Sequence, residues 1–154
     1  MKMKFDQTEF VRRPHWMVVD DNPDVLSLLP GLLALFSDAE IKCFQSPRAA
    51  AAAFKARPGA FDFVITDLEM PGLDGIGLGR QLRALSPTIK ILLATGSGIL
   101  TGAEAVERGF CGLLRKPFLS AALRNALEFA GVIEPRKTTG RKNNFSQPPA
   151  FTTA

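Results

Sequence analysis

Acidic residues follow two short apolar runs of the sequence, and their chemistry is the most informative feature of the chain. Asp20 and Asp21 follow the run 16–19, and Asp67 follows the run 61–66. If these runs are neighbouring strands of an open parallel sheet, the three carboxylates meet beyond the strand ends, where such sheets bind ligands. Clustered carboxylates repel one another unless a divalent cation lies among their oxygens, and hard oxygen ligands suit magnesium. The pattern predicts a magnesium site that offers Asp67 to a phosphoryl group.

Two further polar residues stand close behind the later apolar runs. Thr95 follows the run 89–94, and Lys116 comes shortly after the run 112–114. A hydroxyl donor and an ammonium group are suited to phosphoryl oxygens. Thr95 or Lys116 alone would mean little, and a single aspartate after a strand is usually a helix cap. Together, and in this order, they are improbable by chance, so we expect Asp67 to be the nucleophile with Thr95 and Lys116 beside the phosphoryl group.

Five βα units must position these residues. Apolar, β-rich runs alternate with segments of helical spacing, which predicts a doubly wound parallel α/β sheet with five flanking helices. The expected strands cover residues 16–19, 41–44, 61–66, 89–94 and 112–114. Capping residues mark three helix starts, namely Asn22 before Pro23, Ser46 before Pro47, and Thr101 with Glu104 as a capping box.

A few residues bear on how regular the helices are. Pro30 lies inside the first helical stretch, where it should remove an intrahelical hydrogen bond and bend the helix. Gly77 and Gly79 should each weaken the third helix by about 1 kcal/mol relative to alanine. Gly109 and Gly131 suit left-handed helix ends.

Length and charge describe one domain with short extensions. The chain has 154 residues, 46% of them hydrophobic and 22% charged, which is a globular balance. We expect an arm over residues 1–14, a domain over 15–132 and a basic tail over 133–154. The charged residues after Glu134 are all cations and account for the net charge of +4. A disordered, solvated tail is favoured over a nucleic-acid-binding one, because the segment has no periodicity.

The sequence gives no sign of a membrane protein. No apolar run approaches the roughly 20 residues that a spanning helix needs. The first residues, 1–4, are not followed by the apolar core of a signal peptide. These features predict a cytoplasmic location. Cys43 and Cys111 are expected to be buried free thiols rather than a disulfide.

The chain resembles the receiver domain of two-component response regulators over residues 16–131. The matching stretches are 18–23, 67–75, 93–96 and 116–118. The resemblance implies a flavodoxin-like fold with strand order 2-1-3-4-5. It also implies that Asp67 is the phosphorylation site, that Thr95 and Lys116 contact the phosphoryl group, and that Mg²⁺ is the cofactor. The implied magnesium ligands are Asp20, Asp21, Asp67 and the backbone carbonyl of Glu69.

The same resemblance implies the partners, and the chain differs from the family pattern at one position. The phosphoryl donor would be a sensor histidine kinase or a histidine phosphotransfer protein, and the output a downstream protein effector. Receivers usually carry an aromatic residue where this chain has Leu113, so we expect the loop 96–98 to carry the conformational signal instead. Glu69 and Ser97 stand where receivers tune the loss of the phosphoryl group.

The leading interpretation is a receiver without a covalent output domain, because about twenty residues of tail cannot form one. Its expected output surface covers residues 103–108, Leu113 and 123–129, and a weak homodimer is an open alternative. We expect the protein to catalyse its own phosphorylation and dephosphorylation, and we expect no other enzymatic activity. A magnesium-dependent phosphatase would need a second aspartate where Glu69 stands. A docking module that works without phosphorylation remains the alternative function.

Overall fold

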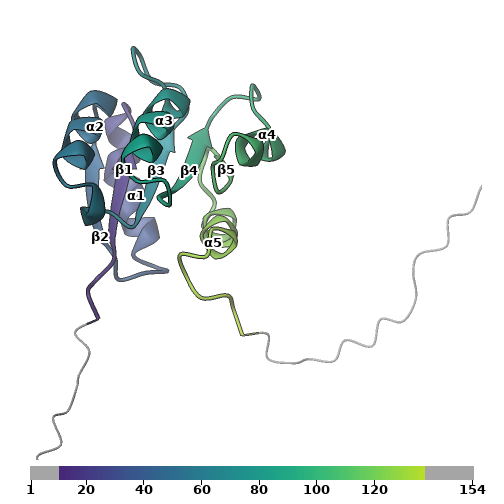
Figure 1. Cartoon of the computed structure of the whole chain (residues 1–154). Coiled ribbons are helices and arrows are strands. Elements are labelled where there is room, and N and C mark those ends of the chain that lie inside the picture. The colour runs from purple at the N-terminus through teal and green to yellow at the C-terminus, as the bar shows by residue number, and fades with distance from the viewer. Residues whose placement is uncertain (1–10, 138–154) are drawn as a thin grey trace, which may run out of the picture.

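The computed structural model describes residues 11–137, which form one parallel sheet with helices on both faces (Figure 1). The predicted arm and tail lie mostly outside this range. The strands are β1 (His15–Val19), β2 (Glu40–Phe44), β3 (Phe63–Asp67), β4 (Lys90–Thr95) and β5 (Leu113–Arg115). The helices are α1 (Pro23–Leu33), α2 (Pro47–Ala56), α3 (Gly75–Leu85), α4 (Gly102–Glu107) and α5 (Ser120–Phe129), with a 3₁₀ turn, η1 (Pro58–Ala60).

The strand order in the sheet is β2-β1-β3-β4-β5, which confirms the predicted topology. All neighbouring strands are parallel, so their carboxyl ends lie along one edge of the sheet. The chain winds outward in one direction from β1 to β2 and in the other from β3 to β5. The reversal lies between β1 and β3, and the crevice at such a switch point is where open α/β sheets bind ligands.

The sheet separates two apolar cores because successive residues of a strand face opposite sides. One core packs β1, β3 and β4 against α2, α3 and α4, and includes Phe54, Leu78 and Phe110. The other packs the opposite face against α1 and α5, and includes Trp16 and Phe63. Residues along β3 are buried on both faces, so this central strand is a rigid support for the residue that ends it.

The helix starts follow the predicted capping residues. Asn22 and Ser46 cap α1 and α2 with Pro at the first turn, and Thr101 forms the capping box with Glu104 at α4. At α3 the cap is Asp74, whose side chain accepts a hydrogen bond from the backbone N–H of Gly77. These caps fix where each helix begins, and hence where the preceding loops lie relative to the strand ends.

Side chains from neighbouring elements lie where Pro30 and Gly79 interrupt the regular pattern of α1 and α3. α1 continues through Pro30. Proline has no backbone N–H, so the carbonyl of Leu26 lacks its helical hydrogen bond. The Sγ of Cys43 lies 4.0 Å from this carbonyl. In α3, a Cβ on Gly79 would lie 2.5 Å from the ring of Phe110. Gly79 therefore gives up helix propensity so that the phenylalanine can pack against the helix backbone.

Two predictions about local structure are wrong. Cys43 is exposed, because β2 is an edge strand of which most residues face solvent, whereas Cys111 is half-buried; both are free thiols. Burial raises the pKa of Cys111 to about 11. The strands β3, β4 and β5 also each end one residue later than predicted. Backbone pairing continues past the last apolar side chain, because the sheet ladder uses main-chain groups whatever the side chain is.

In the part of the chain that the structure covers, no helix is long and apolar enough to cross a membrane.

Candidate functional site

The strand register brings the predicted site residues to one edge of the sheet. Val19 pairs with Thr66, so Asp20 comes directly beside Asp67 at the ends of β1 and β3. Thr95 ends β4 and pairs with Arg115, and the backbone N–H of Lys116 donates to the Thr95 carbonyl at 2.8 Å. Residues nearly 100 positions apart in the sequence are therefore neighbours at the switch point.

Three carboxylates gather in this crevice. Asp20, Asp21 and Asp67 each place an oxygen within 4.8 Å of the others. Asp20 and Asp67 are 2% and 5% exposed, while Asp21 is half-buried. The buried Oδ1 of Asp67 has no aligned hydrogen bond from the described residues. A cluster of hard, partly desolvated oxygens with one oxygen lacking a hydrogen bond fits a magnesium ion.

Lys116 supplies the positive charge next to this cluster. Its Nζ lies 2.6 Å from Oδ2 of Asp20 and 3.1 Å from Oδ1 of Asp67. Burial alone would lower the pKa of the ammonium group, but the hydrogen bond to Asp20 and the negative charges of Asp20 and Asp67 raise it. Lys116 is therefore held in its charged form between two carboxylates, where a phosphoryl oxygen can replace one of them.

Asp67 is the most perturbed carboxyl group of the cluster. Its pKa rises from 3.8 to about 6, first because burial disfavours the charged form and next because Asp20 is negatively charged. Lys116 opposes both effects but does not cancel them. The carboxylate of Asp67 is thus destabilised in the metal-free protein, and a cation among the oxygens would relieve the repulsion.

The hydroxyl of Thr95 points to a different carboxylate. Thr95 Oγ1 donates to Oε1 of Glu69 at 2.5 Å, and the hydroxyl of Ser97 donates to the same oxygen. Thr95 Oγ1 also accepts from the backbone N–H of Ser97 at 3.0 Å. Burial would raise the pKa of Glu69, but the hydrogen bonds from Ser97 and Thr95 outweigh burial and lower the pKa. The proposed role of the Glu69 backbone carbonyl as a metal ligand stays a prediction.

Arg115 is a residue of the site that the sequence reasoning missed. Its side chain donates to the backbone carbonyl of Ser97 and, at 2.9 Å, to that of Leu100. It therefore binds both ends of the loop between β4 and α4 to strand β5. The sequence offered no signal for these contacts, because Arg115 is exposed and a solvated arginine at this position would look the same. Leu113, two residues earlier, is half-buried against the core.

Gly75 has a packing role beyond its place in the motif. A Cβ at this position would lie 2.3 Å from the backbone oxygen of Asp67. The backbone N–H of Gly75 donates to the carbonyl of Leu68 at 3.0 Å. The start of α3 is therefore packed against the backbone that carries Asp67, at a distance that only glycine permits.

The structure thus brings together Asp20, Asp21, Asp67 and Lys116, and it places Thr95 on the neighbouring strand end with its hydroxyl on Glu69. Such a site can bind a divalent cation and an anionic group side by side, with a carboxylate as nucleophile.

Comparison with known proteins agrees with this arrangement. The family model of the response regulator receiver domain matches residues 16–128. The transcriptional regulatory protein FixJ of Bradyrhizobium diazoefficiens is 34% identical over 125 residues, covering 75% of this chain and 56% of FixJ. The C4-dicarboxylate transport transcriptional regulatory protein DctD of Rhizobium meliloti is 32% identical over 114 residues, covering 71% of this chain and 24% of DctD.

Solved structures show the same fold. The crystal structure of a response regulator receiver domain protein from Clostridium thermocellum aligns with a TM-score of 0.69 and 28% sequence identity. The alignment covers 76% of this chain and 93% of that one. By contrast, this chain spans between about a quarter and just over half of the length of the two curated relatives.

Proposed function

Because the chain belongs to the response regulator receiver domain family of two-component systems, we propose that it accepts a phosphoryl group on Asp67 in a magnesium-dependent reaction. The observation that carries the proposal is the cluster of three carboxylates within 4.8 Å, with Lys116 bound to Asp20 and Asp67. A negatively charged nucleophile meets an anionic donor here, and both need positive charge beside them.

The donor is proposed to be a phosphohistidine of a sensor histidine kinase or of a histidine phosphotransfer protein. A carboxylate oxygen of Asp67 forms a bond to phosphorus while the bond from phosphorus to the imidazole nitrogen breaks. The electron pair of that bond returns to the imidazole, which takes a proton from solvent or keeps the one on its other nitrogen. The product is an acyl phosphate on Asp67, and attack of water on its phosphorus would restore the carboxylate and release inorganic phosphate.

Each residue of the site has a part in this reaction. Asp20, Asp21 and Asp67 would hold the magnesium ion, with the backbone carbonyl of Glu69 as a further ligand. The bound ion supplies positive charge to the phosphoryl oxygens as they approach. Lys116 exchanges its contact with Asp67 for a phosphoryl oxygen, and Thr95 donates its hydroxyl to another. The chain thereby acts as a signalling module rather than as a conventional enzyme.

The signal is proposed to pass to a protein effector through α4, β5 and α5. A groove of about 910 Å³ lies between these elements and includes Val106, Leu113 and Phe129. Val106 and Phe129 are 47% and 76% exposed, which is unusual for large apolar side chains that lie together. Both curated relatives are named transcriptional regulatory proteins.

Labelling of Asp67 tests the proposal. The protein is incubated with a small acyl phosphate donor, with magnesium or with a chelator, and the modified residue is found by mass spectrometry. We expect one phosphoryl group on Asp67 that is stable in acid, labile in base and dependent on magnesium. Asp67→Asn should abolish it, while Asp38→Asn, which changes an exposed aspartate just before β2, should not. Equal labelling of Asp67→Asn and the parent would show that the site is assigned wrongly, and absence of labelling in the parent would favour the docking module.

A further inference from the structure

Glu69 accepts a hydrogen bond from Thr95, the residue whose hydroxyl is proposed to donate to the phosphoryl group. Its Oε1 accepts the hydroxyl hydrogens of both Thr95 and Ser97. A threonine hydroxyl carries a single hydrogen, so Thr95 cannot donate to Glu69 and to a second acceptor with full strength. Thr95 is completely buried, so water cannot provide an alternative partner. The other acceptors within reach of this hydroxyl are the hydroxyl oxygen of Ser97 at 3.1 Å and its backbone carbonyl at 3.4 Å, so the charged Oε1 of Glu69 at 2.5 Å is the nearest and strongest acceptor for the single hydrogen.

We infer that Glu69 is a positioning residue, whose carboxylate withholds the hydroxyl of Thr95 until a phosphoryl group on Asp67 competes for it. This inference rests on the proposed function, because it assumes that Asp67 is the acceptor. Glu69 lies two residues after Asp67 in the sequence, and Thr95 ends the neighbouring strand β4. Thr95 can therefore change acceptors without a change in the sheet.

The release of Thr95 has a route to the surface through Arg115. Arg115 pairs with Thr95 in the sheet, and its guanidinium group donates to the carbonyls of Ser97 and Leu100. When Glu69 loses Thr95 and Ser97, the loop 96–100 keeps Arg115 as its link to β5. Leu113 offers no comparable link, because an aliphatic side chain forms no hydrogen bonds. Arg115 is thus a second positioning residue, which couples the loop to the α4-β5-α5 groove.

A double-mutant cycle tests the role of Glu69. Glu69→Gln keeps the size of the side chain but removes its charge, which weakens its hold on Thr95. We expect the initial rate of magnesium-dependent labelling of Asp67 to rise about three- to tenfold, as for the loss of one hydrogen bond to a charged group. The same substitution should have no effect in a Thr95→Val background, where no hydroxyl can be released. In a Thr95→Ser background, which retains the hydroxyl, the increase should return.

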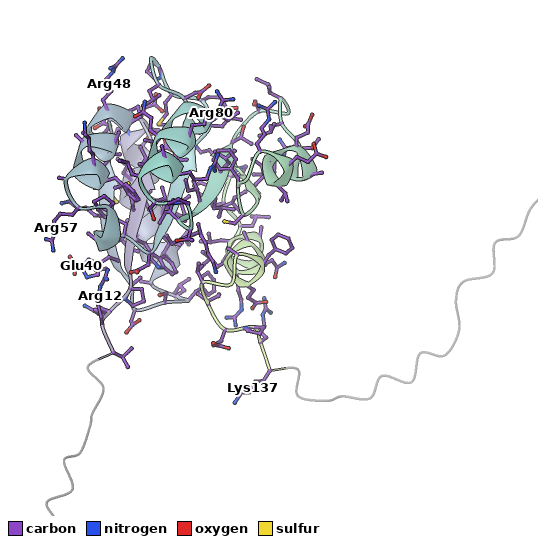
Figure 2. The ribbon with its side chains drawn as sticks, viewed as in Figure 1. Arg12, Glu40, Arg48, Arg57, Arg80 and Lys137 are labelled. Carbon is purple, nitrogen blue, oxygen red and sulfur yellow. The ribbon has the colours of Figure 1, made fainter. Side chains whose placement is uncertain are left out.

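Each result of the cycle has one meaning. If Glu69→Gln raises the rate equally in the Thr95→Val background, Glu69 acts by repelling the anionic donor and the inference is wrong. If the rate does not rise in the parent background, the inference is also wrong, although the proposed function stands. If the parent protein itself is not labelled on Asp67, both the proposed function and the inference about Glu69 are wrong. Glu40→Gln is the matched control, because Glu40 is exposed at the start of β2, at the end of the strand away from the site, where it lies 3.7 Å from His15 (Figure 2).

Hydrogen exchange of the unphosphorylated protein tests Arg115 without any phosphoryl donor. Arg115→Gln removes the guanidinium group that holds the carbonyls of Ser97 and Leu100. We expect backbone exchange across residues 96–100 to accelerate at least about threefold, with Arg115→Lys in between because an ammonium group can hold one carbonyl. Arg48→Gln, at an exposed position of α2, is the control (Figure 2). Unchanged exchange in Arg115→Gln would overturn the coupling role of Arg115.

Discussion

The raised pKa of Asp67 means that the proposed phosphorylation site destabilises the metal-free protein. The shift from 3.8 to about 6 corresponds to a free-energy cost of about 3 kcal/mol for keeping this carboxylate ionised in the folded state. Solvent screening and residual structure in the unfolded state reduce this, so we expect about 1–3 kcal/mol. Replacing Asp67 with asparagine removes the charge at almost constant size. Asp67→Asn should therefore be more stable than the parent at neutral pH without magnesium.

The sign of the pH dependence follows from the direction of the shift. A carboxyl group with a raised folded-state pKa binds its proton more tightly in the folded protein than in the unfolded chain. The parent consequently loses stability as pH rises from about 4 to about 6, and the loss is complete above the folded-state value. Asparagine does not titrate. The stability difference between Asp67→Asn and the parent should be close to zero near pH 4 and largest at pH 7 to 8.

Urea unfolding at pH 4 and pH 8 in the presence of a chelator measures this difference. The control Asp38→Asn should stay within about 0.5 kcal/mol of the parent at both values, because it lies on the surface away from the cluster. Adding magnesium should stabilise the parent at pH 8 more than the variant, since the ion binds the folded state through the intact cluster. If Asp67→Asn is less stable than the parent at pH 8 without magnesium, the carboxylate is not under strain and the electrostatic reasoning fails.

Three further predictions follow from the same structure. Asp21→Asn should weaken magnesium binding, measured by calorimetry, while leaving metal-free stability unchanged or raised, because it relieves repulsion; a large loss of metal-free stability would mean that Asp21 is needed for the turn itself. Gly75→Ala should cost about 1–3 kcal/mol in thermal unfolding, because its Cβ would overlap the backbone of Asp67, whereas Gly59→Ala, with open space around it, should cost much less. Phosphorylation should change hydrogen exchange mainly across residues 96–104 rather than at Leu113, and a change centred on Leu113 would contradict a signal carried by the loop.

The fold and the acidic cluster could be predicted from the sequence because each depends on a local pattern. Apolar runs of strand length and capping residues such as Asn22 and Thr101 mark the βα units, and a parallel sheet then carries all strand ends to one edge. The pairing of Lys116 with Asp20 follows from that geometry. The cap at Asp74 and the close contact at Gly75 were not predicted, because they depend on how α3 begins beside β3.

The hydrogen bonds around Thr95 could not be predicted in the same way. Whether its hydroxyl faces Asp67 or Glu69 depends on side-chain rotamers and on the conformation of a loop that contains Gly96 and Gly98, which strand and helix periodicity do not specify. The partners of Arg115 depend on where the loop carbonyls lie, and no residue type marks a carbonyl. The exposure of Cys43, by contrast, was within reach, because the expected strand order 2-1-3-4-5 already puts β2 at the edge of the sheet.

The ion pair between Lys116 and Asp20 joins residues 96 positions apart, so the site is complete only when both ends of the domain's sequence are in place. Lys116 follows β5, an edge strand of three residues that pairs only with β4. A chain still under synthesis, or one whose β5 has frayed, can already hold the three aspartates but lacks the ammonium group beside them. Local unfolding of β5 would then remove Lys116 from the site while most of the domain remains folded. With Asp67 as the proposed acceptor, competence to receive a phosphoryl group would report that β5 is docked.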